Sequence, residues 1–244
     1  YMSQYMRYES KWWDAYHAVN HHFAQKVLAA VEHDDDIVWV HDYQLMLLPG
    51  FLREERPNLR IGFFLHTPFP SYELFRCLPH REELIQGLLG SDQIGFHTFG
   101  YMRHFRSTVL RLVGYDSEMD HILHEGRRTH IGVYPIGIDA HRFSRELHSK
   151  RHANRKAGLR QTYQGKKVVL SVERLDYSKG IERRLEAIDR FLAAYPHKDS
   201  IVFLFISIPS RVRVNEYRML RERVESRIGQ INGRHGTIQN VPVN

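Results

Sequence analysis

The sequence contains a single cysteine, Cys77, so no disulfide can form within the chain. A chain of this kind suits a reducing compartment, and we expect Cys77 to be a small buried hydrophobic residue. No apolar run approaches the roughly 18 residues that a membrane-spanning helix needs. The first residues also lack the charged start and apolar core of a signal peptide. These absences predict a cytoplasmic protein with no membrane partner.

Phosphate-loop and metal motifs are also missing. The sequence has no Walker-type loop, no G-x-G-x-x-G and no G-x-S-x-G. His17 and His21 have a spacing that could bind a metal on a helix, and His121 and His124 form a second close pair. Neither pair has carboxylate or cysteine partners at metal-ligand spacing. The sequence therefore predicts neither a metal nor another cofactor.

The charge balance is basic, with a net charge of +7 and an isoelectric point near 9.5. Much of the excess lies in residues 148–156 and in a helical stretch at 211–234. Neither stretch alternates aromatic with basic side chains, as a stacking platform for nucleic acid would. Phosphorylated small molecules explain a basic surface equally well, so we predict small anionic substrates and no nucleic acid.

Short apolar runs alternate with amphipathic stretches along the chain. The runs are rich in Val, Ile and Phe, and both their odd and their even positions are apolar. This pattern is typical of strands buried on both faces. They lie at residues 37–40, 61–65, 93–96, 131–134, 168–172 and 201–206. Helical spacing appears between them at residues 12–31, 99–113 and 181–195. This alternation predicts an α/β fold with parallel, doubly wound sheets.

A change of composition divides the chain. Residues 142–167 are polar and basic, and a new series of strand and helix follows them. We therefore predict two Rossmann-like domains, residues 1–142 and 143–244. The chain begins at Tyr1 rather than at a methionine, and residues 238–244 have the character of a new strand or loop. Both ends are interpreted as cuts through a longer protein, so we expect both domains to be incomplete.

Polar residues follow the first two strands, at the edge of the sheet where ligands bind in open α/β folds. Asp42 could cap the next helix, or its carboxylate could accept a hydrogen bond from a sugar hydroxyl. His66 begins the sequence HTPFP, in which two prolines hold the loop rigid. It could be a core histidine or a ligand contact. Because two consecutive strands end in this way, a binding site is favoured.

Basic residues follow the last two strands. Arg174 and Lys179 flank a loop at the expected start of a helix, where free N–H groups and the helix dipole already favour an anion. The pair predicts a diphosphate site, with an ordinary solvated loop as the alternative. Arg211 falls in an expected first helical turn, where a cation opposes the dipole. It either contacts a phosphate or extends into solvent.

At these same residues the sequence resembles the trehalose-6-phosphate synthases of glycosyltransferase family 20, which have the GT-B fold. The matching strings occur in the family's order and spacing over essentially the whole chain. They are VWVHDYQL at 38–45, RIGFFLHTPFP at 60–70, VYPIGI at 133–138, SVERLDYSKG at 171–180 and RIGQING at 227–233.

The resemblance implies transfer of glucose from UDP-glucose to glucose 6-phosphate, with retention, to give α,α-trehalose 6-phosphate. It implies that Asp42 holds acceptor hydroxyls and that His66 contacts the donor glucose. Arg174 and Lys179 would bind the UDP diphosphate and stabilise the leaving group, and Arg211 would bind the acceptor phosphate. The family uses no catalytic metal and is thought to form no covalent enzyme intermediate. The resemblance assigns residues 1–142 to the acceptor-side domain and 143–244 to the nucleotide-sugar domain.

Two parts of the family pattern have no counterpart in this sequence. They are the glycine-rich loop near the start of the family and the acidic segment that grips the donor sugar and ribose. We therefore expect the chain to be inactive by itself. A related synthase with another acceptor, such as a glucosylglycerol-phosphate synthase, and a non-catalytic sugar-phosphate sensor remain as alternatives. The sequence leaves open a homo-oligomer of the full-length protein and a C-terminal phosphatase domain.

Overall fold

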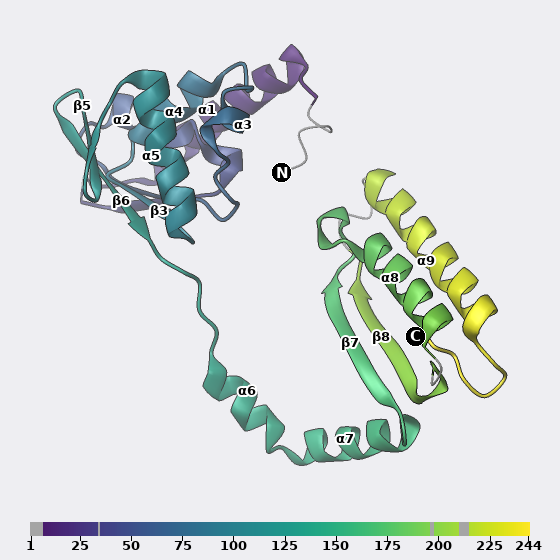
Figure 1. Cartoon of the computed structure of the whole chain (residues 1–244). Coiled ribbons are helices and arrows are strands. Elements are labelled where there is room, and N and C mark those ends of the chain that lie inside the picture. The colour runs from purple at the N-terminus through teal and green to yellow at the C-terminus, as the bar shows by residue number, and fades with distance from the viewer. Residues whose placement is uncertain (1–6, 34, 196–197, 210–214) are drawn as a thin grey trace. The chain divides into compact units, whose positions relative to one another are not determined.

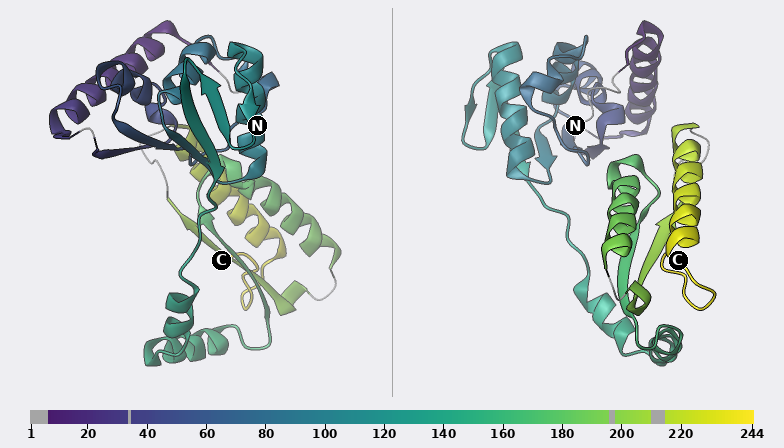
Figure 2. Two further views of the ribbon diagram at one scale, coloured as in Figure 1. Left: turned by 90° about the vertical axis from the view of Figure 1, so that its left-hand side faces the viewer. Right: turned by 45° about the vertical axis from the view of Figure 1, so that its right-hand side comes forward.

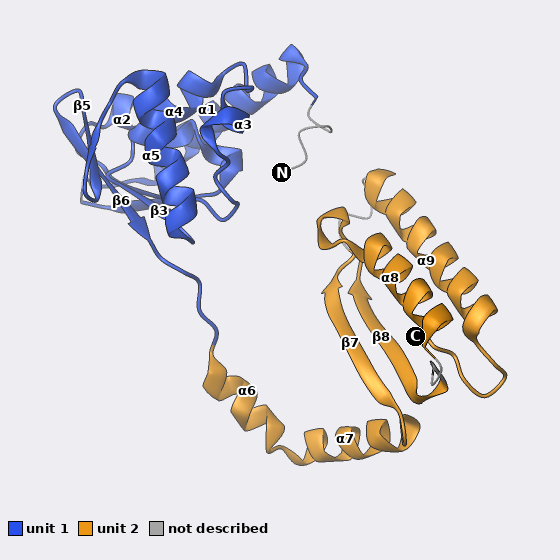
Figure 3. Cartoon of the chain, in the orientation of Figure 1, with its two compact units in different colours: residues 1–138 blue, residues 139–244 orange. Residues whose placement is uncertain are grey.

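The computed structural model describes residues 7–33, 35–195, 198–209 and 215–244, and it divides into two compact units. Unit 1 comprises residues 1–138 and unit 2 residues 139–244 (Figure 3). The break between Ile138 and Asp139 lies close to the joint that the sequence predicts at residue 142. Each unit combines parallel strands with helices, which confirms the α/β class.

Unit 1 is built on a six-stranded sheet with the order β1-β2-β3-β6-β5-β4. Its strands are β1 (Ile37–His41), β2 (Arg60–Phe64), β3 (Gln93–Phe96), β4 (Ser117–Glu118), β5 (His121–His124) and β6 (Arg127–Val133). Its helices are α1 (Ser10–Ala30), α2 (Leu48–Glu55), α3 (Tyr72–Phe75), α4 (Arg81–Leu89) and α5 (Phe99–Val113), with a 3-10 turn η2 (Tyr43–Leu45).

The first four strands of this sheet are parallel. Ile37 pairs with Arg60, Gly62 with Gln93, and Gln93 in turn with His130. The remaining strands, β4 and β5, form an antiparallel extension of β6 (Figure 1). Because β1, β2, β3 and β6 run in one direction, the residues that follow them gather along one edge of the sheet.

Helices cover one face of the unit 1 sheet. The covered face supplies the core residues Phe63, Ile94 and Phe96, which are at most 2% exposed. On the opposite face of β1, Ile37 is 74% and Trp39 is 65% exposed. β1 is thus apolar on both faces, but one of its faces is exposed among the described residues, so the predicted burial of both faces is not seen in this chain.

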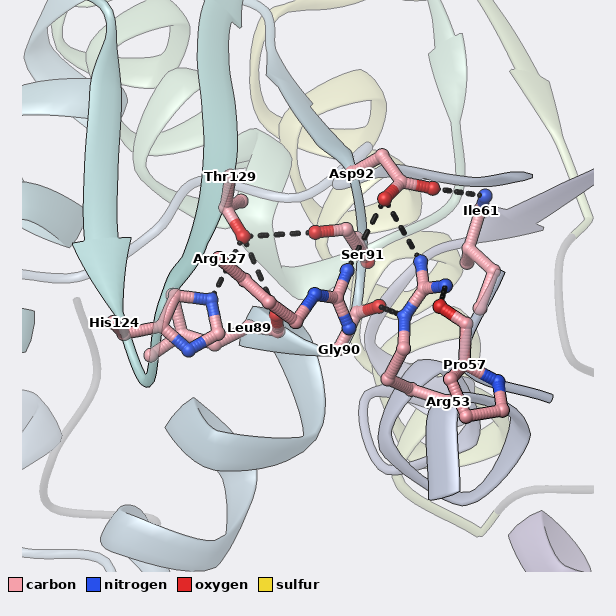
Figure 4. Close-up of polar contacts among 10 residues, drawn as sticks. All are labelled: Arg53, Pro57, Ile61, Leu89, Gly90, Ser91, Asp92, His124, Arg127 and Thr129. Carbon is pink, nitrogen blue, oxygen red and sulfur yellow. Dashed lines mark hydrogen bonds and ion pairs between the residues drawn. The ribbon is translucent and has the colours of Figure 1, made fainter. Parts of the chain in front are cut away.

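A polar network ties together the amino ends of β2, β3 and β6 (Figure 4). Asp92, directly before β3, accepts hydrogen bonds from the Ile61 N–H at 2.7 Å, from Arg53 Nη2 at 2.8 Å and from Arg127 Nη2 at 3.1 Å. Arg53 also donates to the carbonyl oxygens of Gly90 and Pro57. One carboxylate therefore anchors two strands and a helix at the end of the sheet opposite to the site described below.

Unit 2 contains two parallel strands, β7 (Lys167–Arg174) and β8 (Ile201–Ile208), paired from Lys167↔Ile201 to Arg174↔Ile208. Helices α8 (Ile181–Ala194) and α9 (Asn215–His235) run side by side against them (Figures 1 and 2). Their shared core includes Leu185, Ile188, Leu192, Leu220 and Ile231. The remaining elements are α6 (Ala140–Leu147), α7 (Lys150–Thr162), η3 (Tyr177–Lys179) and η4 (Lys198–Ser200).

The structure corrects one prediction, because Cys77 is exposed rather than buried. It lies in the turn after α3, where its N–H donates to the carbonyl oxygen of Leu74 and its thiol to that of Glu73. The buried anchor of this segment is Phe75, at 3% exposure, so Cys77 is left on the outer side. In the part of the chain that the structure describes, no helix is both long and apolar enough to cross a membrane.

Candidate functional site

Three histidines meet at the carboxyl edge of the unit 1 sheet. His41 ends β1, His66 lies two residues after β2, and His97 directly follows β3. His41 Nδ1 and His66 Nε2 are 3.0 Å apart, which is a hydrogen bond. The ring centroids of His66 and His97 lie 5.8 Å apart, and both rings pack against Phe64. The structure thus places His66 in a histidine cluster at the predicted edge.

Asp42 joins this cluster through its carboxylate. Its Oδ1 accepts from the backbone N–H groups of His66 and Thr67 at 3.2 and 3.3 Å, and from Thr67 Oγ1 at 3.4 Å. Asp42 precedes η2, but its side chain makes no capping hydrogen bond, so the capping alternative is not what the carboxylate does. Among the described residues no partner lies on Oδ2, which leaves that oxygen as an acceptor for a ligand hydroxyl.

The backbone of Asp42 is held in an unusual conformation, with φ 67° and ψ 173°. A non-glycine residue in this region carries a strain of about 1–3 kcal/mol, which persists only where its surroundings hold it. The Asp42 N–H donates to the Phe64 carbonyl oxygen at 2.8 Å. From α1, Tyr16 Oη donates to the carbonyl oxygen of Tyr43 at 2.7 Å and accepts from the Met46 N–H at 3.0 Å. The turn that carries Asp42 is therefore fixed from two sides.

Unit 2 carries the predicted basic loop, between β7 and α8. Arg174 is the last residue of β7, and Lys179 ends η3, separated from α8 by Gly180 alone. Gly180 links them to the helix with φ 67°, a left-handed conformation that glycine adopts without strain. The side chains of Arg174 and Lys179 form no ion pair with any described carboxylate. Both cations are exposed, as an anion site requires.

The buried carboxylate of Asp176 shapes this loop from within. Its Oδ1 accepts from the Ser178 N–H at 2.9 Å, and its Oδ2 from Tyr217 Oη at 3.4 Å. Burial by itself raises the pKa of Asp176. The hydrogen bonds from Ser178 and the charges of Arg174 and Lys179 outweigh it, so the pKa lies below its usual range. The ionised carboxylate therefore stabilises the turn that presents Lys179.

The start of α8 is suited to an anion. Its N-cap is Gly180, which supplies no side-chain hydrogen bond to the first-turn N–H groups. Glu182 is the acidic residue of that turn, and Arg223 of α9 holds its carboxylate at 2.8 Å. The N–H groups and the positive end of the dipole thus lie beside Lys179 with no capping side chain.

Arg211 lies outside the described residues. Within the described ranges, no three histidine, cysteine or carboxylate side chains gather as a metal site would require. His17 and His21, which have the spacing of helix metal ligands, instead present their rings to Phe51. His124 lies buried and hydrogen-bonded to Thr129, with its pKa lowered by burial and by the charge of Arg127.

Sequence reasoning did not single out His41 or His97. His97 follows its strand directly, so the rule that identified Asp42 and His66 would also have found it. His41 directly follows the predicted run at residues 37–40, so the same rule would have found it as well. Arg184, discussed below, lies inside a regular helix and gives no local signal.

The structure belongs to the Rossmann-like α/β class. Its parallel strands carry polar side chains at their carboxyl ends, the edge where ligands bind in open α/β folds. Comparison with known proteins then gives the family. The chain belongs to glycosyltransferase family 20, which it matches over residues 1–244.

The chain is similar to an α,α-trehalose-phosphate synthase [UDP-forming] of Emericella nidulans, with 45% identity over 236 residues. That match covers 95% of this chain and 47% of the relative. A solved E. coli structure, described as trehalose-6-phosphate bound with UDP-2-fluoro glucose, matches at 34% identity and a TM-score of 0.90. It covers 98% of this chain and 53% of that one.

A third match is a Burkholderia xenovorans α,α-trehalose-phosphate synthase (UDP-forming) in complex with glucose-6-phosphate. It has 30% identity and a TM-score of 0.84, over 99% of this chain and 55% of that one. These structures confirm the GT-B type of fold. The chain spans about half the length of the curated relatives that it matches.

Proposed function

We propose that the protein containing this chain is a retaining glucosyltransferase, which transfers glucose from UDP-glucose to glucose 6-phosphate and forms α,α-trehalose 6-phosphate. The observation that carries the proposal is the loop at the start of α8. It offers two cations, Arg174 and Lys179, that have no ion-pair partner among the described residues, beside N–H groups that the N-cap Gly180 cannot cap. A diphosphate leaving group needs that arrangement when no metal supplies the charge. Relatives bound to a UDP-glucose analogue and to glucose 6-phosphate support both substrates.

In this reaction the bond between C1 of the donor glucose and the β-phosphate oxygen breaks, and UDP leaves. C1 bonds to the acceptor hydroxyl oxygen on the same face of the sugar, and the hydroxyl proton passes to the departing phosphate oxygen. Arg174 and Lys179 stabilise the charge that grows on that phosphate. Asp42, through Oδ2, accepts a hydrogen bond from an acceptor hydroxyl, and His66 contacts the donor glucose.

The domain roles and partners belong to the same proposal. Residues 1–142 form the acceptor side, and residues 143–244 bind the nucleotide sugar. Arg211 binds the 6-phosphate of the acceptor, the role that the resemblance to the family implies for it. The substrates are small molecules present in the cytoplasm, where we place the protein. A homo-oligomer of the full-length protein is compatible with these roles.

The test is UDP release from UDP-glucose with glucose 6-phosphate, on this chain and on a version extended at both ends. We expect product only from the extended protein. In that protein, Lys179→Ala or Arg174→Ala should lower kcat by about 10²–10³, the loss expected for one preorganised charge-stabilising group. Arg183→Ala, which removes an equal charge from an exposed position of α8, should leave kcat within about threefold. Near-normal turnover in either loop variant would refute the leaving-group assignment.

Glycerol 3-phosphate serves as the competing acceptor in the same assay. A preference for it would replace the trehalose proposal with a glucosylglycerol-phosphate synthase and leave the donor site unchanged. Binding of both substrates without any UDP release would identify a sugar-phosphate sensor.

A further inference from the structure

Arg184 connects the end of β7 with the turn that carries Lys179. From α8, its Nη1 donates to Ser171 Oγ at 2.5 Å and to Glu173 Oε1, and its Nη2 donates to the carbonyl oxygen of Lys179 at 3.2 Å. Ser171 Oγ in turn donates to Glu173 Oε1 at 2.9 Å. One guanidinium therefore joins the two ends of the basic loop.

The Glu173 carboxylate pairs with Arg184 and not with Arg174 or Lys179. The Glu173 side chain is 10% exposed, and a carboxylate so far from water needs a cation beside it. Arg184 is that cation, although Arg174 is next to Glu173 in sequence. Because Glu173 and Arg174 are consecutive on a strand, their side chains point to opposite faces. Pairing with Arg184 leaves Arg174 and Lys179 without a carboxylate partner among the described residues.

We propose that Arg184 is a positioning residue for the diphosphate site. It neutralises Glu173 and fixes the carbonyl group of Lys179, so the loop presents two cations in one conformation before a ligand arrives. This inference rests on the proposed diphosphate-binding role of Arg174 and Lys179. Arg184 itself need not touch the ligand.

An arginine suits this position better than a lysine does. The guanidinium is a planar fork, so Nη1 can serve the β7 acceptors while Nη2 serves the Lys179 carbonyl. A lysine ammonium would keep the charge for Glu173, but its single nitrogen cannot occupy both places. The conservative variant Arg184→Lys therefore separates positioning from charge.

The experiment measures binding of inorganic pyrophosphate to the 244-residue chain by calorimetry at fixed ionic strength. Pyrophosphate needs no base or sugar contacts, so it probes the loop alone. We expect Lys179→Gln to raise Kd about tenfold, the loss of one charge-assisted contact. Arg184→Gln should raise Kd by a similar factor, because the loop then no longer holds Lys179 in its binding conformation before pyrophosphate arrives. Arg184→Lys should raise Kd several-fold. Arg183→Gln is the matched control, with the same charge change one residue away on an exposed side chain, and should stay within about twofold.

Hydrogen exchange supplies a readout that a change in net charge would not move. Arg184→Gln and Arg184→Lys should speed amide exchange in residues 174–180, and Arg183→Gln should not. If Arg184→Gln does not fold because Glu173 is left unpaired, the double variant Glu173→Gln/Arg184→Gln removes that charge. The double variant should fold, and it should bind pyrophosphate more weakly than the wild-type chain does.

The outcomes distinguish the two proposals. If wild-type and Lys179→Gln chains bind pyrophosphate equally poorly, the diphosphate site fails and the positioning role fails with it. If Lys179→Gln loses affinity while Arg184→Gln matches Arg183→Gln, the site stands and the positioning role is refuted. Full affinity in Arg184→Lys, or in the double variant, would also refute it.

Discussion

Replacing Asp92 with alanine should destabilise unit 1 by about 3 kcal/mol, as the lost hydrogen bonds indicate. The Asp92 carboxylate is the common acceptor for the Ile61 N–H, Arg53 and Arg127 (Figure 4). The change leaves the backbone bonds of residue 92 in place, because its N–H still reaches the Ile61 carbonyl oxygen. Only the contributions of the carboxylate are removed.

The magnitude follows from the exposure of each partner. Ile61 is 1% exposed, so water cannot replace the acceptor that its N–H loses, and the unsatisfied N–H costs about 1–3 kcal/mol. Arg53 has an 11% exposed side chain and loses its counter-charge, but it keeps the carbonyl oxygens of Gly90 and Pro57, so its share is about 1 kcal/mol. Arg127 is 28% exposed and Asp92 itself 47%, so water limits that pair to less than about 1 kcal/mol.

Urea unfolding followed by tryptophan fluorescence is the assay. All three tryptophans, Trp12, Trp13 and Trp39, lie in unit 1, so their emission reports on this unit alone. Asp92→Asn keeps one carbonyl oxygen as an acceptor and should lose about half as much as Asp92→Ala. Asp14→Ala is the control, since this exposed aspartate of α1 forms no hydrogen bond or ion pair among the described residues. It should stay within about 0.5 kcal/mol of wild type. A loss below about 1 kcal/mol for Asp92→Ala would refute the assigned role.

Three further changes test other parts of the structure. Burial raises the pKa of Tyr16 to about 12, so the unfolding free energy should fall as pH rises from about 10 to 12, and Tyr16→Phe should flatten that slope in urea titrations. A Cβ at Gly87 would lie 2.6 Å from the Met46 carbonyl oxygen and 2.8 Å from Leu47 Cα. Gly87→Ala should therefore cost about 2–3 kcal/mol by tryptophan-monitored unfolding, whereas Gly100→Ala should be neutral or stabilising. A hydrogen bond from His235, followed by the charges of Arg234 and Arg227, lowers the pKa of Asp189. The ionised Asp189 carboxylate therefore stabilises the folded state above its unfolded-state pKa of about 3.9, and this stabilisation is lost as pH falls through the lower pKa of the folded state. In an acid titration followed by helical circular dichroism, the signal of Asp189→Asn should therefore change less with pH than that of the wild type.

The parallel strands could be predicted because they depend on local chemistry, whereas no apolar run marked the short strands β4 and β5. The candidate site was located by an equally local rule. Apolar runs of four to six residues determined where strands form, and the rule that ligands bind beyond carboxyl ends led directly to Asp42 and His66. The basic loop was recognisable because Arg174 and Lys179 stand at a helix start. These features need only neighbouring residues and the direction of the chain.

The features that escaped prediction depend on partners far apart in the sequence. No local pattern shows that the Asp42 carboxylate bonds to the loop at residues 66–67 rather than capping η2. Cys77 appeared to be a buried hydrophobic residue by composition alone, but its turn is anchored through Phe75. Which residues of a helix face a given loop is decided by packing, so Arg184 was visible only in the structure.

The two units hold different kinds of chemistry, and this division has an energetic reason. The Asp42 carboxylate is anchored by neutral donors, the N–H groups of His66 and Thr67 and the Thr67 hydroxyl, rather than by a cation. Such a carboxylate can accept a sugar hydroxyl without first giving up an ion pair. The basic loop needs the opposite environment, in which its cations have no carboxylate partner. Strand alternation keeps Glu173 away from Arg174, and its ion pair with Arg184 engages the carboxylate that could otherwise pair with Lys179. The most informative side chain of the proposed diphosphate site is therefore one that is not expected to touch the diphosphate.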